Sequence, residues 1–309
     1  MVTRVSTTGN YSSVLANLMA AQQRQIAAGD QLATQKKGSD LKDYAKDAEL
    51  LTAMRSIKTR IEVYQEQNGL IADKLVTQDA ALNRVADAAL GTRQAIAEAL
   101  ASGRVDTLVE DIQNQLRNAA EGMNARYGGK YLFAGGQVDT RPVTATSLAD
   151  LTAGPPISSF FLNDNFKITA KIDDSTNVAT GILAKDLGTD MLTAFKTFQT
   201  FQQGGSGPFT GTMTAAQRTF LEGQLATWDG IREDITNEAA RNGLVQRRVE
   251  SVKGDLQTRN NAITGMMGDV TDADMAMAAT QLQAAQLSVQ AAAQVFISLQ
   301  NTSLINILK

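Results

Sequence analysis

The sequence contains neither cysteine nor histidine among its 309 residues. Their absence excludes disulfide bonds, thiolate metal sites, cysteine nucleophiles and every catalytic arrangement that relies on an imidazole base. An enzyme would have to work through carboxylates, and no pair of them stands out as a site. Catalysis is therefore the weakest hypothesis, and we assign no catalytic residue, no metal ligand and no cofactor.

Aromatic residues make up only 5% of the chain, although 43% of it is hydrophobic. A chain rich in alanine and poor in aromatics packs narrow helix–helix seams better than a thick core. No run of about 18 apolar residues exists, so we expect no membrane insertion, and the polar first 20 residues lack the apolar stretch of a secretory signal. The 29 basic and 32 acidic residues are well mixed, so no basic stripe predicts nucleic-acid binding.

Apolar residues recur every 3.5 positions along two long segments, at about residues 54–96 and 221–263. A heptad period held this long predicts a coiled-coil rod of two antiparallel helices of similar length. Asn68 and Gln78 fall on the same seam, where polar side chains would fix the register. The other predicted seam residues are Ile57, Ile61, Ile71, Leu75, Leu82, Val85, Leu225, Trp228, Val245, Val249, Val252 and Leu256.

Both ends of the chain also carry helical patterns, at residues 11–33 and 272–308, with broad apolar faces rich in alanine. A large apolar face on a terminus marks an interaction surface, so we expect head-to-tail assembly with copies of this chain. In a free subunit these ends would be disordered, because termini are loose unless docked. The predicted assembly interface comprises Tyr11, Val14, Leu15, Leu18, Leu32, Leu282, Val289, Phe296, Leu299, Leu304 and Leu308.

Three aspartates, Asp269, Asp272 and Asp274, precede the last helix. They would cap its N-terminus and favour its dipole. Three carboxylates also suit a calcium ion, and that alternative stays open.

Residues 137–207 interrupt the helices with a small, partly β domain. Turn glycines around residues 131–134 indicate a hairpin, residues 158–162 and 166–172 indicate strands, and residues 192–201 indicate a helix. The predicted fold is mainly α with a small β-containing insertion. We divide the chain into an N-terminal assembly helix with a connecting segment (1–43), the N-terminal half of the rod with a short hairpin (44–136), the middle domain (137–207), the C-terminal half of the rod (208–268) and a C-terminal assembly helix (269–309).

This order of elements resembles the flagellin superfamily, in which terminal helices form an inner tube, a helical bundle surrounds it and a variable domain faces solvent. Four strings are similar to the hook–filament junction branch of that family. Residues 126–142 resemble GRYLFAGSxTDxxPF, residues 237–249 resemble xRAxxGAxxNRLE, residues 270–276 resemble LEDxDxAEA and residues 296–308 resemble ARISQLSLLDYL. Residues 36–43 depart from the family's GKRINxPSDDP, because they lack its proline, and the tail lacks the aromatic DYL ending.

The resemblance implies a structural subunit of the bacterial flagellum that polymerises into a ring joining hook to filament. It implies an extracellular location, reached through the flagellar type III apparatus without a cleaved signal peptide. The implied partners are copies of itself, a hook-side junction protein, filament flagellin and an export chaperone on the C-terminal helix. Two alternatives stay open. One is a filament flagellin. The other is a coiled-coil module whose middle domain binds a ligand, for which Phe160, Phe161 and Phe166 are the available aromatics.

Overall fold

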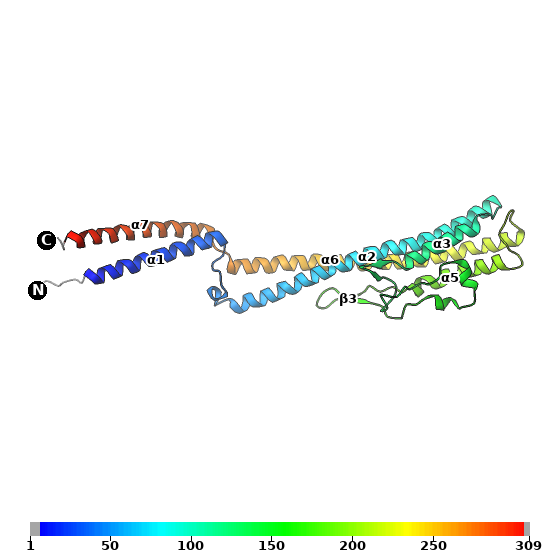
Figure 1. Cartoon of the computed structure of the whole chain (residues 1–309), viewed down its shortest axis with the longest axis horizontal. Coiled ribbons are helices and arrows are strands. Elements are labelled where there is room, and N and C mark those ends of the chain that lie inside the picture. The colour runs from blue at the N-terminus through cyan, green and yellow to red at the C-terminus, as the bar shows by residue number, and fades with distance from the viewer. Residues whose placement is uncertain (1–6, 306–309) are drawn as a thin grey trace. The chain divides into compact units, whose positions relative to one another are not determined.

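The structure is a computed structural model that describes the backbone of residues 7–305 and the side chains of residues 12–298. The chain divides into two compact units. The first comprises residues up to Ile61 together with those from Arg259 onward, and the second is Glu62–Thr258. Helices dominate both units, and the strands form only two small antiparallel sheets in the described residues, which confirms the predicted fold class (Figure 1).

The first unit contains a helix from each end of the chain. Helix α1 is Thr7–Thr34 and helix α7 is Met275–Ile305, and the two pack against each other (Figure 1). In the described residues both ends are helical and paired, and the expected disorder of the free subunit stays a prediction. Small side chains let two helices approach closely, so each gives the other a partner. Among the side chains that the structure describes in this pair, the buried ones are all alanines: Ala21, Ala28, Ala278 and Ala285.

Helices α2 (Ala48–Ser102) and α6 (Ala215–Thr271) carry the predicted seam. Within the second unit they run antiparallel, because the residue numbers on α6 fall as those on α2 rise. Their paired side chains include Gln65 with Gln257, Gln78 with Asn242, and Arg93 with Asp229.

Most of the predicted seam positions are shielded from solvent. The buried ones are Ile61, Leu75, Leu82, Val85, Trp228, Val249, Val252 and Leu256, and the half-buried ones are Ile71, Leu225 and Val245. The seam does not close at Ile57, which is 40% exposed. A side chain at a heptad position stays more exposed to solvent where fewer neighbouring helices contact it.

A thicker core forms in the second unit, where α3 (Leu108–Met123) and α5 (Ala184–Gln203) join α2 and α6 in one hydrophobic cluster. The rings of Phe195 and Trp228 lie 4.7 Å apart at its centre. The few aromatics of the chain are concentrated here, since further ring contacts join Phe198, Phe201, Phe209 and Phe220. The expectation of narrow seams from the low aromatic content therefore holds for the long helix pairs, whereas this core is rich in aromatic side chains.

The segments between the long helices hold the strands and the short helices. Strands β1 (Arg126–Tyr127) and β2 (Lys130–Tyr131) form a hairpin that turns on two glycines, slightly earlier than predicted. Strands β3 (Thr169–Lys171) and β4 (Asn177–Ala179) form the second hairpin. The remaining short elements are η1 (Leu41–Tyr44), α4 (Leu148–Thr152) and η2 (Ile157–Phe160).

The strand predicted over residues 158–162 is wrong, because η2 occupies most of it. Pro156 stands at the N-cap of this short helix, and proline is well suited to the start of a helical turn. Of the predicted strand, Phe161 alone makes a β-bridge, and its partner is Val143. The helix predicted over residues 192–201 is confirmed as part of α5.

Candidate assembly surface

The terminal helix pair presents its large apolar side chains to solvent. On α1, Met19 is 51% and Ile26 is 63% exposed, and on α7, Leu287 is 68% exposed. Leu15, Met275, Met277, Val295 and Ile297 are exposed as well. Globular proteins normally bury such residues, and here alanines lie inside while leucines, isoleucines and methionines lie outside. A helix that is apolar on both sides is normally buried on both sides, so we expect the exposed faces of α1 and α7 to be buried when subunits assemble.

The predicted interface residues divide between the two sides of this pair. Leu15 lies on the exposed side. Six others are half-buried and stand three, four, seven or eleven residues from a buried alanine of the same helix, which places them on the side where α1 and α7 meet. These six are Val14, Leu18, Leu32, Leu282, Val289 and Phe296. Tyr11, Leu299 and Leu304 lie in the helices, but their side chains, and Leu308 altogether, lie outside the described residues.

Sequence reasoning missed the exposed residues Met19, Ile26, Leu287, Val295 and Ile297. The reason is that the apolar residues of each helix were treated as one broad face, whereas they form two. The signal was present in side-chain size, because alanines follow one stripe and large residues follow another. Although α7 is apolar on both sides, no helix in the described part of the chain is long and apolar enough to cross a membrane.

A groove of about 430 Å³ follows the seam between α1 and α7. Alanines from both helices form its apolar surface, and Arg24 on α1 and Ser288 on α7 contribute polar groups. The full lining is Arg24, Ala27, Ala28, Gln31, Gln281, Ala284, Ala285 and Ser288. The small side chains that bring the helices together thus leave a depression on their surface.

The three aspartates before α7 have separate roles. Asp274 caps α7, since its carboxylate accepts hydrogen bonds from the backbone N–H groups of Ala276 and Met277, both at 3.0 Å. Asp272 pairs instead with Lys36, whose hydrogen bond is the main cause that lowers the pKa of Asp272. The capping prediction is confirmed for Asp274. In the residues that the structure describes, no group of acidic, histidine or cysteine side chains is placed to hold a metal ion.

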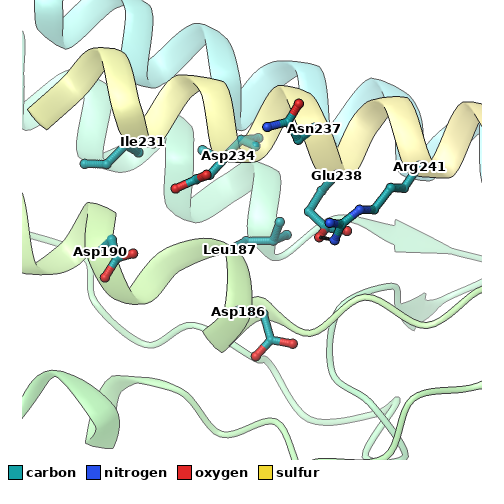
Figure 2. A pocket seen from close by; sticks show the side chains of 9 residues that line it. Asp186, Leu187, Asp190, Ile231, Asp234, Asn237, Glu238 and Arg241 are labelled. Atoms are coloured by element: carbon teal, nitrogen blue, oxygen red, sulfur yellow. Dashed lines mark hydrogen bonds and ion pairs between the residues drawn. The ribbon is translucent and has the colours of Figure 1, made fainter. Parts of the chain in front are cut away.

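The second unit has a hollow of about 250 Å³ between α5 and α6 (Figure 2). Asp186 and Asp190 on α5 and Asp234 and Glu238 on α6 border it (Figure 2). The apolar side chains of Leu187, Ile231 and Ile235 also line it. Arg241 pairs with Glu238, and Lys167 pairs with Asp186 at 3.0 Å. Two of the four carboxylates are thus neutralised, and the lining supplies acidic surface without a hydroxyl or amine nucleophile.

The aromatics of the middle domain do not form a shared platform. Phe160 and Phe161 are buried, whereas Phe166 is 61% exposed. Asp164 holds the loop beside Phe166 in place, because its carboxylate accepts hydrogen bonds from the N–H groups of Gly136 and Phe166, both at 2.9 Å. These bonds also lower the pKa of Asp164. Of the three aromatics, only Phe166 is accessible to a ligand.

Comparisons with known proteins show what the chain is similar to. Residues 225–308 match the family model of the bacterial flagellin C-terminal helical region. The chain is 25% identical over 277 residues to flagellin C of Rhizobium meliloti (strain 1021), which covers 84% of both proteins. These matches confirm the resemblance to the flagellin superfamily.

Solved structures share the fold. A putative flagellar hook-associated protein from Vibrio parahaemolyticus superposes with a TM-score of 0.61 at 13% identity, covering 74% of this chain and 100% of that one. FlgL of Bacillus cereus superposes with a TM-score of 0.53 at 14% identity, covering 71% of this chain and 99% of that one. At these identities the likeness concerns the fold alone.

Proposed function

Since the chain carries the C-terminal helical region of the bacterial flagellins, we propose that it is a structural, non-enzymatic subunit of the bacterial flagellum. The observation that carries this proposal is the arrangement of α1 and α7, with alanines inside and large apolar residues outside. Burying one exposed leucine or isoleucine side chain is worth about 1.5–3 kcal/mol, so several of them favour association strongly. The exposed side of α1 and the exposed side of α7 are different surfaces. A contact between the two on neighbouring copies is heterologous and produces a ring or a tube of copies.

Within the flagellum, the subunit forms the ring that joins hook to filament. Two observations support this finer assignment. The string at residues 126–142, similar to that of junction proteins, forms the β1–β2 hairpin and the buried segment after it. The fold also matches that of a putative flagellar hook-associated protein. The neighbours in this role are copies of the chain, a hook-side junction protein and filament flagellin.

The junction role also leads us to expect a particular export route and a particular task for each segment of the chain. The subunit reaches the outside of the cell without a cleaved signal peptide, and a chaperone covers α7 before assembly. Residues 1–43 and 269–309 make the assembly contacts, residues 44–136 and 208–268 form the rod, and residues 137–207 form the middle domain. The apolar outer side of α7, with Leu287 and Ile297, supports the need for such a cover.

A filament flagellin is the second candidate. The relationship to flagellin C, which spans 84% of this chain, favours it. Both candidates use the same terminal helices, so the assembly surface does not separate them. They differ in the number of copies for each flagellum.

Quantitative mass spectrometry of isolated flagella tests the proposal. A junction subunit is present in a small, fixed ratio to the hook protein, and its deletion leaves hooks without filaments. A large excess over the hook protein, rising with filament length, would make the chain a filament flagellin. Absence of the chain from washed flagella would overturn both candidates.

A further inference from the structure

The rod has a narrow stretch, where α2 and α6 continue past the four-helix core of the second unit (Figure 1). The buried residues of that core lie on α2 from Ala81 onward and on α6 up to Ile235. We refer to residues 62–78 of α2 and 242–258 of α6, all within the second unit, as the narrow stretch. Two of the polar pairs between α2 and α6 stand near its ends. A seam between only two helices stays partly open to solvent unless a further element covers it.

The β3–β4 hairpin of the middle domain provides such a cover. The amide nitrogen of Asn68 on α2 donates a hydrogen bond to the carbonyl oxygen of Ile172 at 2.9 Å. The Tyr64 hydroxyl, one helical turn away, donates to the Asp174 carboxylate at 3.2 Å. The side chain of Ile172 is fully buried, although it does not belong to the four-helix core. Its bond to Asn68 places this buried residue at the narrow stretch.

Asn68 occupies its seam position at a cost. The residue is 0% exposed, and its Oδ1 atom has no hydrogen-bond partner among the described residues. A buried polar atom without a partner destabilises a fold, whereas a leucine at a heptad position packs without that loss. The hydrogen bond of the amide nitrogen goes to the hairpin and not to α6. What Asn68 contributes in return for the cost is therefore the attachment of the hairpin.

The hairpin in turn depends on the rod. Strands β3 and β4 have three residues each, and a two-stranded hairpin alone is at best marginally stable in water. Its base is closed, because the N–H groups of Thr180 and Gly181 both donate to the carbonyl oxygen of Ile168 at 2.9 Å. Gly181 has no room for a side chain there, since an added Cβ would lie 2.3 Å from the backbone nitrogen of Ile168. The hairpin is thus a closed element of the middle domain whose turn end lies on α2.

We propose that the β3–β4 hairpin is a brace, which holds α2 against α6 along the narrow stretch and fixes the middle domain to the rod. Asn68 is its positioning residue, and Ile172 is its buried anchor. The heptad position of Asn68 by itself predicts a role in helix register, whereas its hydrogen bond supports attachment of the brace. This inference concerns the folded second unit and does not depend on the flagellar role. Its failure is therefore distinguishable from failure of the proposed function.

Hydrogen exchange of the backbone amides in the full chain tests the brace. Ile172→Ala removes the anchor without changing either helix. Amides of residues 64–75 and 245–256 should exchange at least about tenfold faster, because truncation of a buried isoleucine is a costly substitution. Amides around Trp228 should keep the parent rate, since this residue lies in the four-helix core. Thr169→Ala is the matched control, because Thr169 is exposed on the same hairpin and its loss should leave every rate unchanged.

Asn68→Leu separates the brace from a register role and keeps the test valid if Ile172→Ala does not fold. The brace predicts faster exchange at the hairpin amides of Ile172 and Thr180, because the bond that attaches the hairpin is lost. A register role predicts parent rates in the hairpin and slower exchange in the seam, because leucine packs better there. That result would overturn the proposal. Parent rates along the narrow stretch of Ile172→Ala would also overturn it, as would equal acceleration throughout the second unit.

Discussion

Leu287→Ala separates the assembly role of α7 from its role in the fold. Leu287 is 68% exposed, so its truncation leaves the free subunit about as stable as before, within roughly 0.5 kcal/mol. A buried leucine side chain contributes about 1.5–3 kcal/mol. The exposed share of that value, lost when the assembled face no longer buries it, is about 1–2 kcal/mol for each subunit.

That loss sets the size of the expected effect. Since 1.4 kcal/mol is a factor of ten in an equilibrium constant, the concentration of free subunit in equilibrium with assemblies should rise roughly 5- to 30-fold. Analytical ultracentrifugation over a concentration series measures this quantity. Leu244→Ala is the matched control, because Leu244 is 59% exposed on α6 and belongs to the second unit. Equal free-subunit concentrations for the two variants would refute the assignment of the assembly surface.

Further predictions concern the core, the glycines and the ion pair of Lys36 with Asp272. Trp228→Ala should destabilise the second unit by about 3–5 kcal/mol in denaturant unfolding, because its side chain is 1% exposed. Gly122→Ala should cost about 1–3 kcal/mol, since its Cβ would lie 2.6 Å from a methyl group of Val85. Gly230→Ala, which meets open space, should stabilise α6 by up to about 1 kcal/mol in the same assay. The Lys36 hydrogen bond lowers the pKa of Asp272, so this contact stabilises the first unit above the pKa that the carboxyl has in the unfolded chain. The stability of this unit in denaturant unfolding should fall as the pH falls below about 4, and Asp272→Asn should reduce that pH dependence.

The long helices could be predicted from the sequence, because a heptad period is a local property of the chain. Leu75, Leu82 and Val85 are buried where the period places them. The period does not identify the partner of each stripe. Asn68 is buried at its predicted position, yet its amide donates to the carbonyl oxygen of Ile172 at 2.9 Å, next to the β3–β4 hairpin. Gln78 does meet α6, at Asn242.

The terminal helices show the same limit. Periodicity identified apolar residues at both ends but did not decide which stripe closes within the chain. That choice depends on side-chain size, since Ala28 and Ala285 pack inside and Ile26 and Leu287 stay outside. The contacts of Lys36 and Lys37 with residues 269–271 could not be predicted, for another reason. Lys36 and Lys37 break the helical period, and their partners lie more than 230 residues away in the sequence.

Immunogold electron microscopy of isolated flagella tests the central claim most directly. An epitope inserted after Gly154 lies in an exposed stretch of the middle domain, which follows α4 and is distant in sequence from both terminal helices. The account predicts gold particles confined to the boundary between hook and filament. Gold along the whole filament would contradict the junction role, and flagella without gold would contradict the structural role altogether.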